Sequence, residues 1–216
     1  MPAWDWAGRE KFAGPGACLG IMPAMSRPTA CLPVAASALA LLACSPALDW
    51  RSVPLPEAGI TLSLPCKPER AARPVDLGAG VVELSMVGCR ADGATFALSH
   101  MPLADPSQAG AALARWRTAV LARMQAGPQA QAGTAFVPRQ ALDLPQSLRM
   151  VVRGRGADGA EVVAEAVWFA RLEGRQARLY HAVVYAPQPR TAAADTFFTG
   201  LALAAVSAQR RHRAAP

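Results

Sequence analysis

The chain has 216 residues, and 22 Lys and Arg against 15 Asp and Glu give it a formal net charge of +7. Much of this excess lies in the C-terminal run Arg210-Arg211-His212-Arg213. No aromatic residue is interleaved with these arginines, as a surface that stacks nucleic-acid bases would require. We therefore expect no nucleic-acid partner, and we predict that residues 207–216 are a basic disordered tail.

An apolar run from Leu32 to Ala43 ends at Cys44 and follows a single basic residue, Arg27. The last four residues, Leu41-Leu42-Ala43-Cys44, resemble a bacterial lipobox. The run is too short for a transmembrane helix, which needs about 20 apolar residues. Its arrangement is that of a secretory signal. The resemblance predicts that residues 25–43 are a lipoprotein signal peptide and that Cys44 is lipidated.

Ordinary cleavage after Ala47 is the alternative, because signal classes overlap in composition. Ser45 stands where an inner-membrane lipoprotein usually carries Asp, so we expect a lipid anchor in the outer membrane with the protein facing the periplasm. Residues 1–24 do not resemble a charged signal start, and we predict that they are upstream sequence, with a genuine cytoplasmic extension as the alternative. Residues 44–56 are expected to be a membrane-proximal linker.

Two of the five cysteines, Cys66 and Cys89, fall within the predicted domain. Two thiols in an oxidising compartment usually pair. Neither belongs to a CxxC motif or has a histidine nearby, which speaks against a metal site. We therefore predict a Cys66–Cys89 disulfide, worth about 3 kcal/mol through restriction of the unfolded chain.

Residues 57–206 are predicted to form one domain that begins with three strands. Residues 60–64 alternate apolar and polar side chains, which is typical of a strand with one buried face. Residues 81–90 and 95–103 are predicted to be strands joined at Asp92-Gly93, because Asp-Gly tolerates the backbone angles of a tight hairpin.

A helix is predicted to begin at Asp105-Pro106, because Asp caps free amide groups and Pro is tolerated in the first turn. Gly127-Pro128 is expected to end it. Apolar residues at helical spacing form one face: Ala109, Leu113, Trp116, Val120 and Met124. We interpret Trp116 as part of the core rather than as a binding aromatic.

The second half of the domain repeats the pattern of strands followed by a helix. Strands are predicted at residues 134–137, 147–155, 161–172 and 176–185, with turns at Asp158-Gly159 and Glu173-Gly174. A last helix is predicted over residues 192–205, with inward-facing Phe197, Phe198, Leu201 and Ala205. This order of elements predicts an α+β domain, an antiparallel sheet covered by helices.

Two segments of the domain resemble Mog1/PsbP-like domains. Residues 59–68, Gly-Ile-Thr-Leu-Ser-Leu-Pro-Cys-Lys-Pro, are similar to the opening strand of that family, and residues 197–201, Phe-Phe-Thr-Gly-Leu, are similar to its closing helix. The resemblance spans roughly residues 50–205. It implies an α/β/α sandwich, often carried on lipoproteins, with no shared catalytic site.

Residues 154–159 match the dinucleotide motif G-x-G-x-x-G. That motif requires a helix immediately after it, but the residues that follow alternate as in a strand. We predict a glycine-rich hairpin and no cofactor. Glu161 and Glu165 belong to this strand and are expected to line its solvent face.

His100 and His181 are the candidate general bases, although each lies in a strand-like segment. Ser99 adjoins His100, but neighbours in a strand point to opposite faces, so the two are not expected to form a dyad. Four methionines, Met86, Met101, Met124 and Met150, are isolated and do not indicate a copper site.

These features favour a non-catalytic envelope lipoprotein that binds a small ligand or a protein, or helps to assemble a complex. The alternative is an envelope hydrolase that uses His100 or His181. We assign no catalytic residue, cofactor or metal ligand. The membrane is expected as a partner through the lipid anchor, and the binding surface is expected on loops 69–79 and 127–133.

Overall fold

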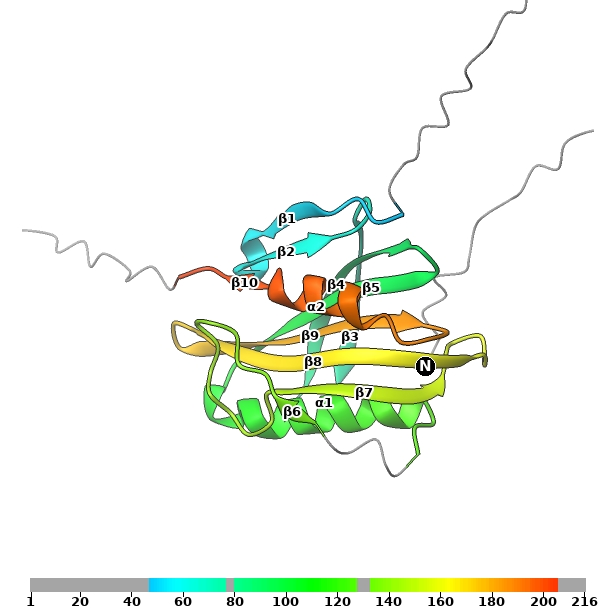
Figure 1. The fold of residues 1–216 in the computed structure, drawn as a ribbon. Coiled ribbons are helices and arrows are strands. Elements are labelled where there is room, and N and C mark those ends of the chain that lie inside the picture. Colours follow the sequence, from blue (N-terminus) through cyan, green and yellow to red (C-terminus); the bar gives the residue numbers. More distant parts are fainter. Residues whose placement is uncertain (1–46, 77–79, 128–132, 206–216) are drawn as a thin grey trace, which may run out of the picture. The chain divides into compact units, whose positions relative to one another are not determined.

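The computed structural model describes residues 47–76, 80–127 and 133–205 (Figure 1). Several predictions lie outside the described residues: the extension 1–24, the signal peptide 25–43, the lipidation site Cys44 and the tail 207–216. Within the described residues, neither helix is long and apolar enough to cross a membrane.

Ten strands and two α-helices make up the described chain. The strands are β1 (Arg51–Leu55), β2 (Ile60–Leu64), β3 (Glu69–Asp76), β4 (Val81–Ala91), β5 (Ala94–Leu103), β6 (Thr134–Ala135), β7 (Leu148–Arg155), β8 (Glu161–Glu173), β9 (Gln176–Ala186) and β10 (Ala202–Leu203). The helices are α1 (Ala109–Arg123) and α2 (Thr191–Thr199). Two short 3-10 turns, Pro56–Ala58 and Pro106–Gln108, follow β1 and precede α1.

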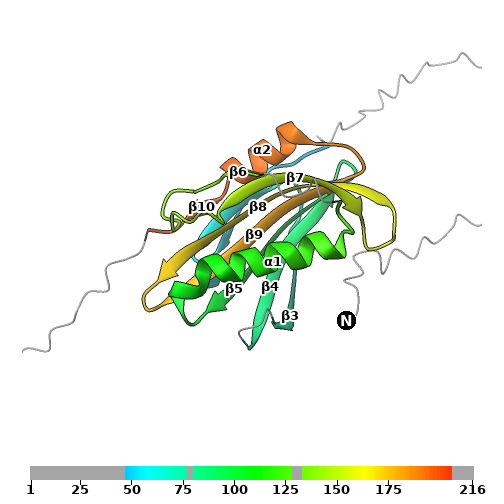
Figure 2. The same cartoon turned by 90° about the horizontal axis from the view of Figure 1, so that it is seen from below.

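Seven strands form one sheet in the order β3-β4-β5-β9-β8-β7-β6, and every neighbouring pair is antiparallel. A second, three-stranded sheet has the order β1-β2-β10. Helix α1 covers one face of the large sheet, and α2 and the small sheet cover the other (Figures 1 and 2). The predicted α+β class, an antiparallel sheet covered by helices, is confirmed.

Each face of the large sheet has its own hydrophobic core. On the α1 side, Leu113 and Trp116 pack against Trp168 and neighbouring residues of the sheet. On the other side, side chains of the small sheet and α2, including Leu62 and Phe197, pack against the sheet. Full burial of one such side chain stabilises the fold by roughly 1.5–3 kcal/mol. The helical stripe predicted to be core, Trp116 included, does face the sheet.

The predicted linker 44–56 differs from the structure at its C-terminal end. Residues 51–55 form β1, which pairs with β2 so that Val53 lies opposite Leu62. Val53 and Leu55 are buried, so this segment belongs to the domain. The segment is short and contains Pro54, which weakens its strand signal.

The predicted loop 69–79 is wrong for residues 69–76, which form the edge strand β3. β3 pairs with β4, and Arg70 lies opposite Val87. Its charged residues and Pro74 are features that proteins place on sheet edges, and they also make the segment look like a loop.

The second helix is shorter than predicted. α2 ends at Thr199, and residues 202–203 pair with β2 as the strand β10. Phe197 and Phe198 are buried as predicted, but Ala205 is exposed because the helix does not reach it. Helix α1 likewise ends at Arg123 rather than near Gly127.

Candidate functional site

A hollow on the large sheet follows from its strand register. Ala72 lies opposite Ser85, Ser85 opposite His100, and His100 opposite Tyr180, so these four side chains form one row on the face toward the small sheet. Arg70 lies two residues before Ala72 in β3, on the same face. Because Ala72 and Ser85 are small, a pocket of about 330 Å³ opens here, lined by His100 and Arg70 among others.

One wall of the pocket comes from Leu55 and Glu57, at the corner after β1. Two hydrogen bonds hold this corner against the large sheet. The Tyr180 hydroxyl donates to the Ala58 carbonyl oxygen at 2.6 Å, and Arg171 Nη1 donates to the Gly59 carbonyl oxygen at 2.6 Å. Because Tyr180 is the cross-strand neighbour of His100, its bond to Ala58 brings the corner over His100.

His100 is 5% exposed and ends a chain of polar contacts between β5, β8 and β9. Arg178 Nη1 lies 3.2 Å from His100 Nδ1, and Arg178 Nε also binds the Glu173 carboxylate at 2.9 Å. A guanidinium group can only donate, so Nδ1 accepts and the proton of neutral His100 lies on Nε2. Burial, and secondly the Arg178 charge, lower the pKa of His100, although the carboxylate of Glu57 partly opposes them.

The imidazole is therefore arranged as a hydrogen-bond donor. Its Nδ1 is occupied by Arg178, and its Nε2 has no hydrogen-bond partner among the described residues. Arg70 and Glu57 are exposed, and within the described chain neither forms an ion pair. The pocket is thus lined by a neutral imidazole whose remaining nitrogen is a donor, by one cation, by one anion and by an apolar surface.

His181 lies on the opposite face of the sheet, beneath α1. Its ring stacks on Trp168 at a centroid distance of 4.6 Å and meets the edge of Trp116 at 5.6 Å. Nε2 is buried without a hydrogen-bond partner, and burial lowers the pKa of His181 to about 3. These surroundings make His181 a neutral core residue.

Ser99 and His100 point to opposite faces, as predicted. Strand register instead places Ser99 directly opposite His181, a pairing that the sequence alone did not reveal. No hydrogen bond joins Ser99 to His181 in the described part of the chain, and burial alone accounts for the lowered pKa of His181. The pair therefore lacks the oriented base that would activate a serine hydroxyl.

The two glutamates of β8 differ in their surroundings. Glu161 is exposed as predicted, but the prediction for Glu165 is wrong, because this side chain is 2% exposed. Its carboxylate accepts hydrogen bonds from Arg149 Nη2 at 3.2 Å and from the Arg190 backbone N–H at 3.1 Å. Arg190 immediately precedes α2, so Glu165 fixes the start of that helix.

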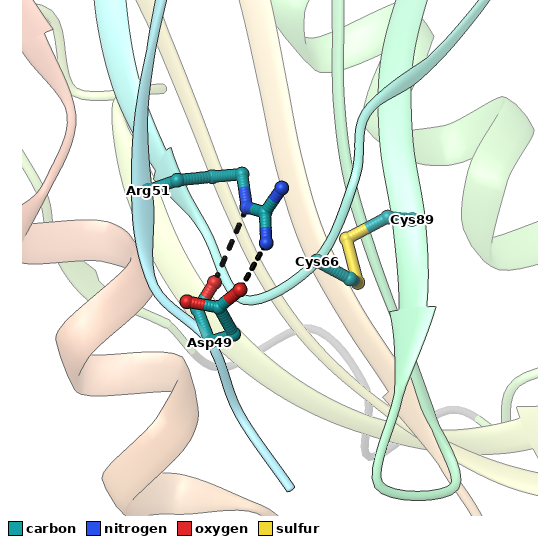
Figure 3. The surroundings of a disulfide bond; sticks show 4 residues. All are labelled: Asp49, Arg51, Cys66 and Cys89. Atoms are coloured by element: carbon teal, nitrogen blue, oxygen red, sulfur yellow. Dashed lines mark hydrogen bonds and ion pairs between the residues drawn. A yellow bond between two sulfur atoms is a disulfide. The ribbon is translucent and has the colours of Figure 1, made fainter. Parts of the chain in front are cut away.

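The predicted Cys66–Cys89 disulfide is confirmed, with a Cα–Cα distance of 5.8 Å. It joins the segment after β2 to β4 (Figure 3), near an ion pair between Asp49 and Arg51. The small sheet is thereby covalently tied to the large one. Among the described residues, no group of three or more His, Cys, Asp or Glu side chains could hold a metal ion.

The glycine-rich motif at residues 154–159 is a hairpin, as predicted. β7 and β8 pair across it, and Gly159 has a left-handed φ of 80°. No helix follows the motif, because residues 161–173 form β8. The other predicted binding loop, residues 127–133, lies outside the described residues except at its ends.

His100 was a candidate from sequence, but its role as a donor depends on Arg178, which is distant in the chain. Arg178 and Tyr180 are two residues apart in a predicted strand, so their side chains lie on the same face. This spacing is the sequence feature that could have indicated a polar group beside His100. A scan against models of protein families finds no match, and neither does a search of curated proteins. The function is therefore inferred from the residues of this chain.

Proposed function

We propose that this chain is a lipid-anchored lipoprotein of the bacterial envelope whose domain binds a ligand or partner without chemical turnover. Cys44 carries the anchor in the outer membrane, and the domain faces the periplasm. The lipobox-like residues 41–44 support this location, and the Cys66–Cys89 disulfide is of the kind that persists in an oxidising compartment.

The domain is of the Mog1/PsbP-like type, an α/β/α sandwich. Supporting this, an antiparallel sheet has α1 on one face and α2 on the other. The segments that carry the resemblance are the opening strand β2 and the C-terminal half of α2 with Gly200 and Leu201. The three layers are α1, the large sheet and α2. The small sheet β1-β2-β10 lies beside α2 and is an additional element.

One observation carries the binding role. His100 lines a pocket of about 330 Å³, and its tautomer is fixed by Arg178 so that Nε2–H is a donor. A general base would need an unprotonated nitrogen facing the substrate. A hydrolase that uses His181 is also disfavoured, because that ring is enclosed between two tryptophans.

The test uses the full-length protein in its native envelope. A Ser85→Leu variant fills the floor of the pocket while leaving His100, Arg70 and Glu57 in place. We expect wild type, but not Ser85→Leu, to retain a bound molecule detectable by mass spectrometry after gentle purification. As a control, Glu69→Gln changes an exposed residue of β3 that does not line the pocket.

Two results would contradict this function. One is the same set of bound molecules in wild type and in a folded Ser85→Leu protein. The other is turnover of an ester or amide substrate by wild type that is lost in a folded His100→Ala protein, which would assign a hydrolase.

A further inference from the structure

We propose that the pocket at His100 binds a small zwitterion with an apolar side chain, that is, an apolar amino acid or a short apolar peptide. This inference rests on the proposed binding role and adds the class of ligand. It follows from the three polar groups of the pocket, Glu57, Arg70 and His100, and from the apolar surface between them.

The three groups call for a ligand that carries both charges. The His100 Nε2–H and the Arg70 guanidinium are donors, and the Glu57 carboxylate is an acceptor. A carboxylate on the ligand would accept from the first two, and an ammonium group would donate to Glu57. All three protein groups then gain a partner, and the ligand brings no net charge into the pocket.

Simpler ligands leave one group unmatched. A fatty or aromatic acid would place its charge near the unpaired carboxylate of Glu57. An alkylamine would be repelled by Arg70 and would offer no acceptor to His100. A purely apolar molecule would cover all three groups and leave their hydrogen bonds to water unreplaced, which is unfavourable.

The spacing of the polar groups and the volume of the pocket fit an amino acid or a short peptide. His100 and Arg70 share one sheet face but lie on β5 and β3, two strands apart and two residues out of register, which corresponds to roughly 12 Å between their Cα atoms. The small residues Ala72 and Ser85 lie in this gap. A volume of about 330 Å³ is at the lower end of the range for ligand pockets. Leu55 and Val87 supply apolar surface for the ligand's side chain.

The strand register explains why the ligand would reach His100. β3 is the edge strand, and its residues on this face are exposed, so the cover provided by the small sheet ends over the pocket. His100 lies two strands further in, on β5, and is almost fully buried. A ligand would therefore lie with its carboxylate between Arg70 and His100 and with its ammonium toward Glu57 at the wall.

Isothermal titration calorimetry on the purified full-length protein tests this. The probes are L-leucine, N-acetyl-L-leucine without the ammonium, L-leucinamide without the carboxylate, and the dipeptide Leu-Leu. We expect L-leucine to bind at least tenfold more tightly than either blocked analogue. If Leu-Leu binds more tightly than L-leucine, the natural ligand is a peptide. If L-leucine binds more tightly, the natural ligand is a free amino acid.

Charge-neutralising variants connect each ligand group to a residue. Arg70→Gln should weaken L-leucine about tenfold, whereas the cation L-leucinamide should bind no more weakly than to wild type, because the repulsion by Arg70 is removed. Glu57→Gln should weaken L-leucine about tenfold, whereas the anion N-acetyl-L-leucine should bind no more weakly than to wild type, because the repulsion by Glu57 is removed. Glu69→Gln, on the same strand but outside the pocket, should bind like wild type.

The inference is overturned if none of the zwitterionic probes binds at millimolar concentration, or if a folded Ser85→Leu protein binds L-leucine as wild type does. Preference for an analogue with a single charge would also overturn it. The proposed binding role is separable from this outcome. If envelope purification yields a pocket-dependent molecule of another class, the ligand assignment fails and the binding role remains.

Discussion

The burial of His181 predicts a specific loss of stability in mild acid. Its ring is enclosed by Trp168 and Trp116, and burial lowers its pKa from 6.5 to about 3. Between these values the unfolded chain binds a proton at His181 and the native protein does not. The free energy of unfolding must therefore fall as pH decreases from about 6.5 toward 3.

The magnitude follows from the two pKa values. Each unit of difference corresponds to 1.36 kcal/mol, so the full effect is on the order of 5 kcal/mol near pH 3. At pH 5 the unfolded histidine is nearly fully protonated and the native one is neutral. The contribution lost at that pH is about 2 kcal/mol relative to pH 7.5.

His181→Phe isolates this contribution, because phenylalanine keeps a ring against Trp168 and does not titrate. Urea unfolding of wild type and variant, followed by tryptophan fluorescence with the disulfide intact, gives the free energy at pH 7.5, 6.5, 5.5 and 5.0. Relative to wild type, His181→Phe should gain about 2 kcal/mol between pH 7.5 and 5.0. Other titrating groups are common to both proteins and cancel in this comparison.

His212→Phe provides a matched control, because it removes a histidine from the predicted C-terminal tail. It should show the pH dependence of wild type. If wild type and His181→Phe lose stability in parallel between pH 7.5 and 5.0, the native His181 is not held neutral by burial. The reasoning from its surroundings would then be wrong.

Three further predictions concern stability and location. Replacing Cys66 and Cys89 together by Ser should lower the free energy of unfolding by about 3 kcal/mol in urea titrations, and an unchanged midpoint would contradict a structural role. Cys44→Ala should lose both a metabolic fatty-acid label and membrane retention; continued labelling would exclude this lipidation site. Tyr180→Phe should cost about 1–3 kcal/mol by leaving the Ala58 carbonyl without its donor, and a cost near zero would show that the bond does not hold the corner.

Most strands could be predicted because their alternation is local. Residues 60–64 alternate apolar and polar side chains, and Asp92-Gly93 marks the hairpin before the largely apolar residues 95–103. β1 and β3 could not be predicted with the same rule. Each pairs with the next strand in the chain, but β1 is short and contains Pro54, and β3 is a charged edge strand that also contains a proline.

The candidate site depends on information that sequence alone does not carry. His100 could be selected as a titratable residue, but the hollow beside it requires Ala72 and Ser85 to align with it across three strands. A shift of one residue in either pairing would move these side chains to the opposite face. Similarly, Glu165 could not be recognised as buried without knowing that α2 begins over it.

The wall that carries Glu57 is fixed to the large sheet at several independent points. The Cys66–Cys89 disulfide ties the end of β2 to β4, Tyr180 holds the Ala58 carbonyl, and Arg171 binds the carbonyls of Gly59 and Ala204. These restraints reduce the conformational freedom that a ligand would otherwise have to remove on binding, so they favour affinity through preorganisation. His100 needs no such restraint, because it belongs to a central strand of the sheet. Loss of the disulfide or of the Tyr180 hydroxyl should therefore weaken recognition by Glu57 more than recognition by His100.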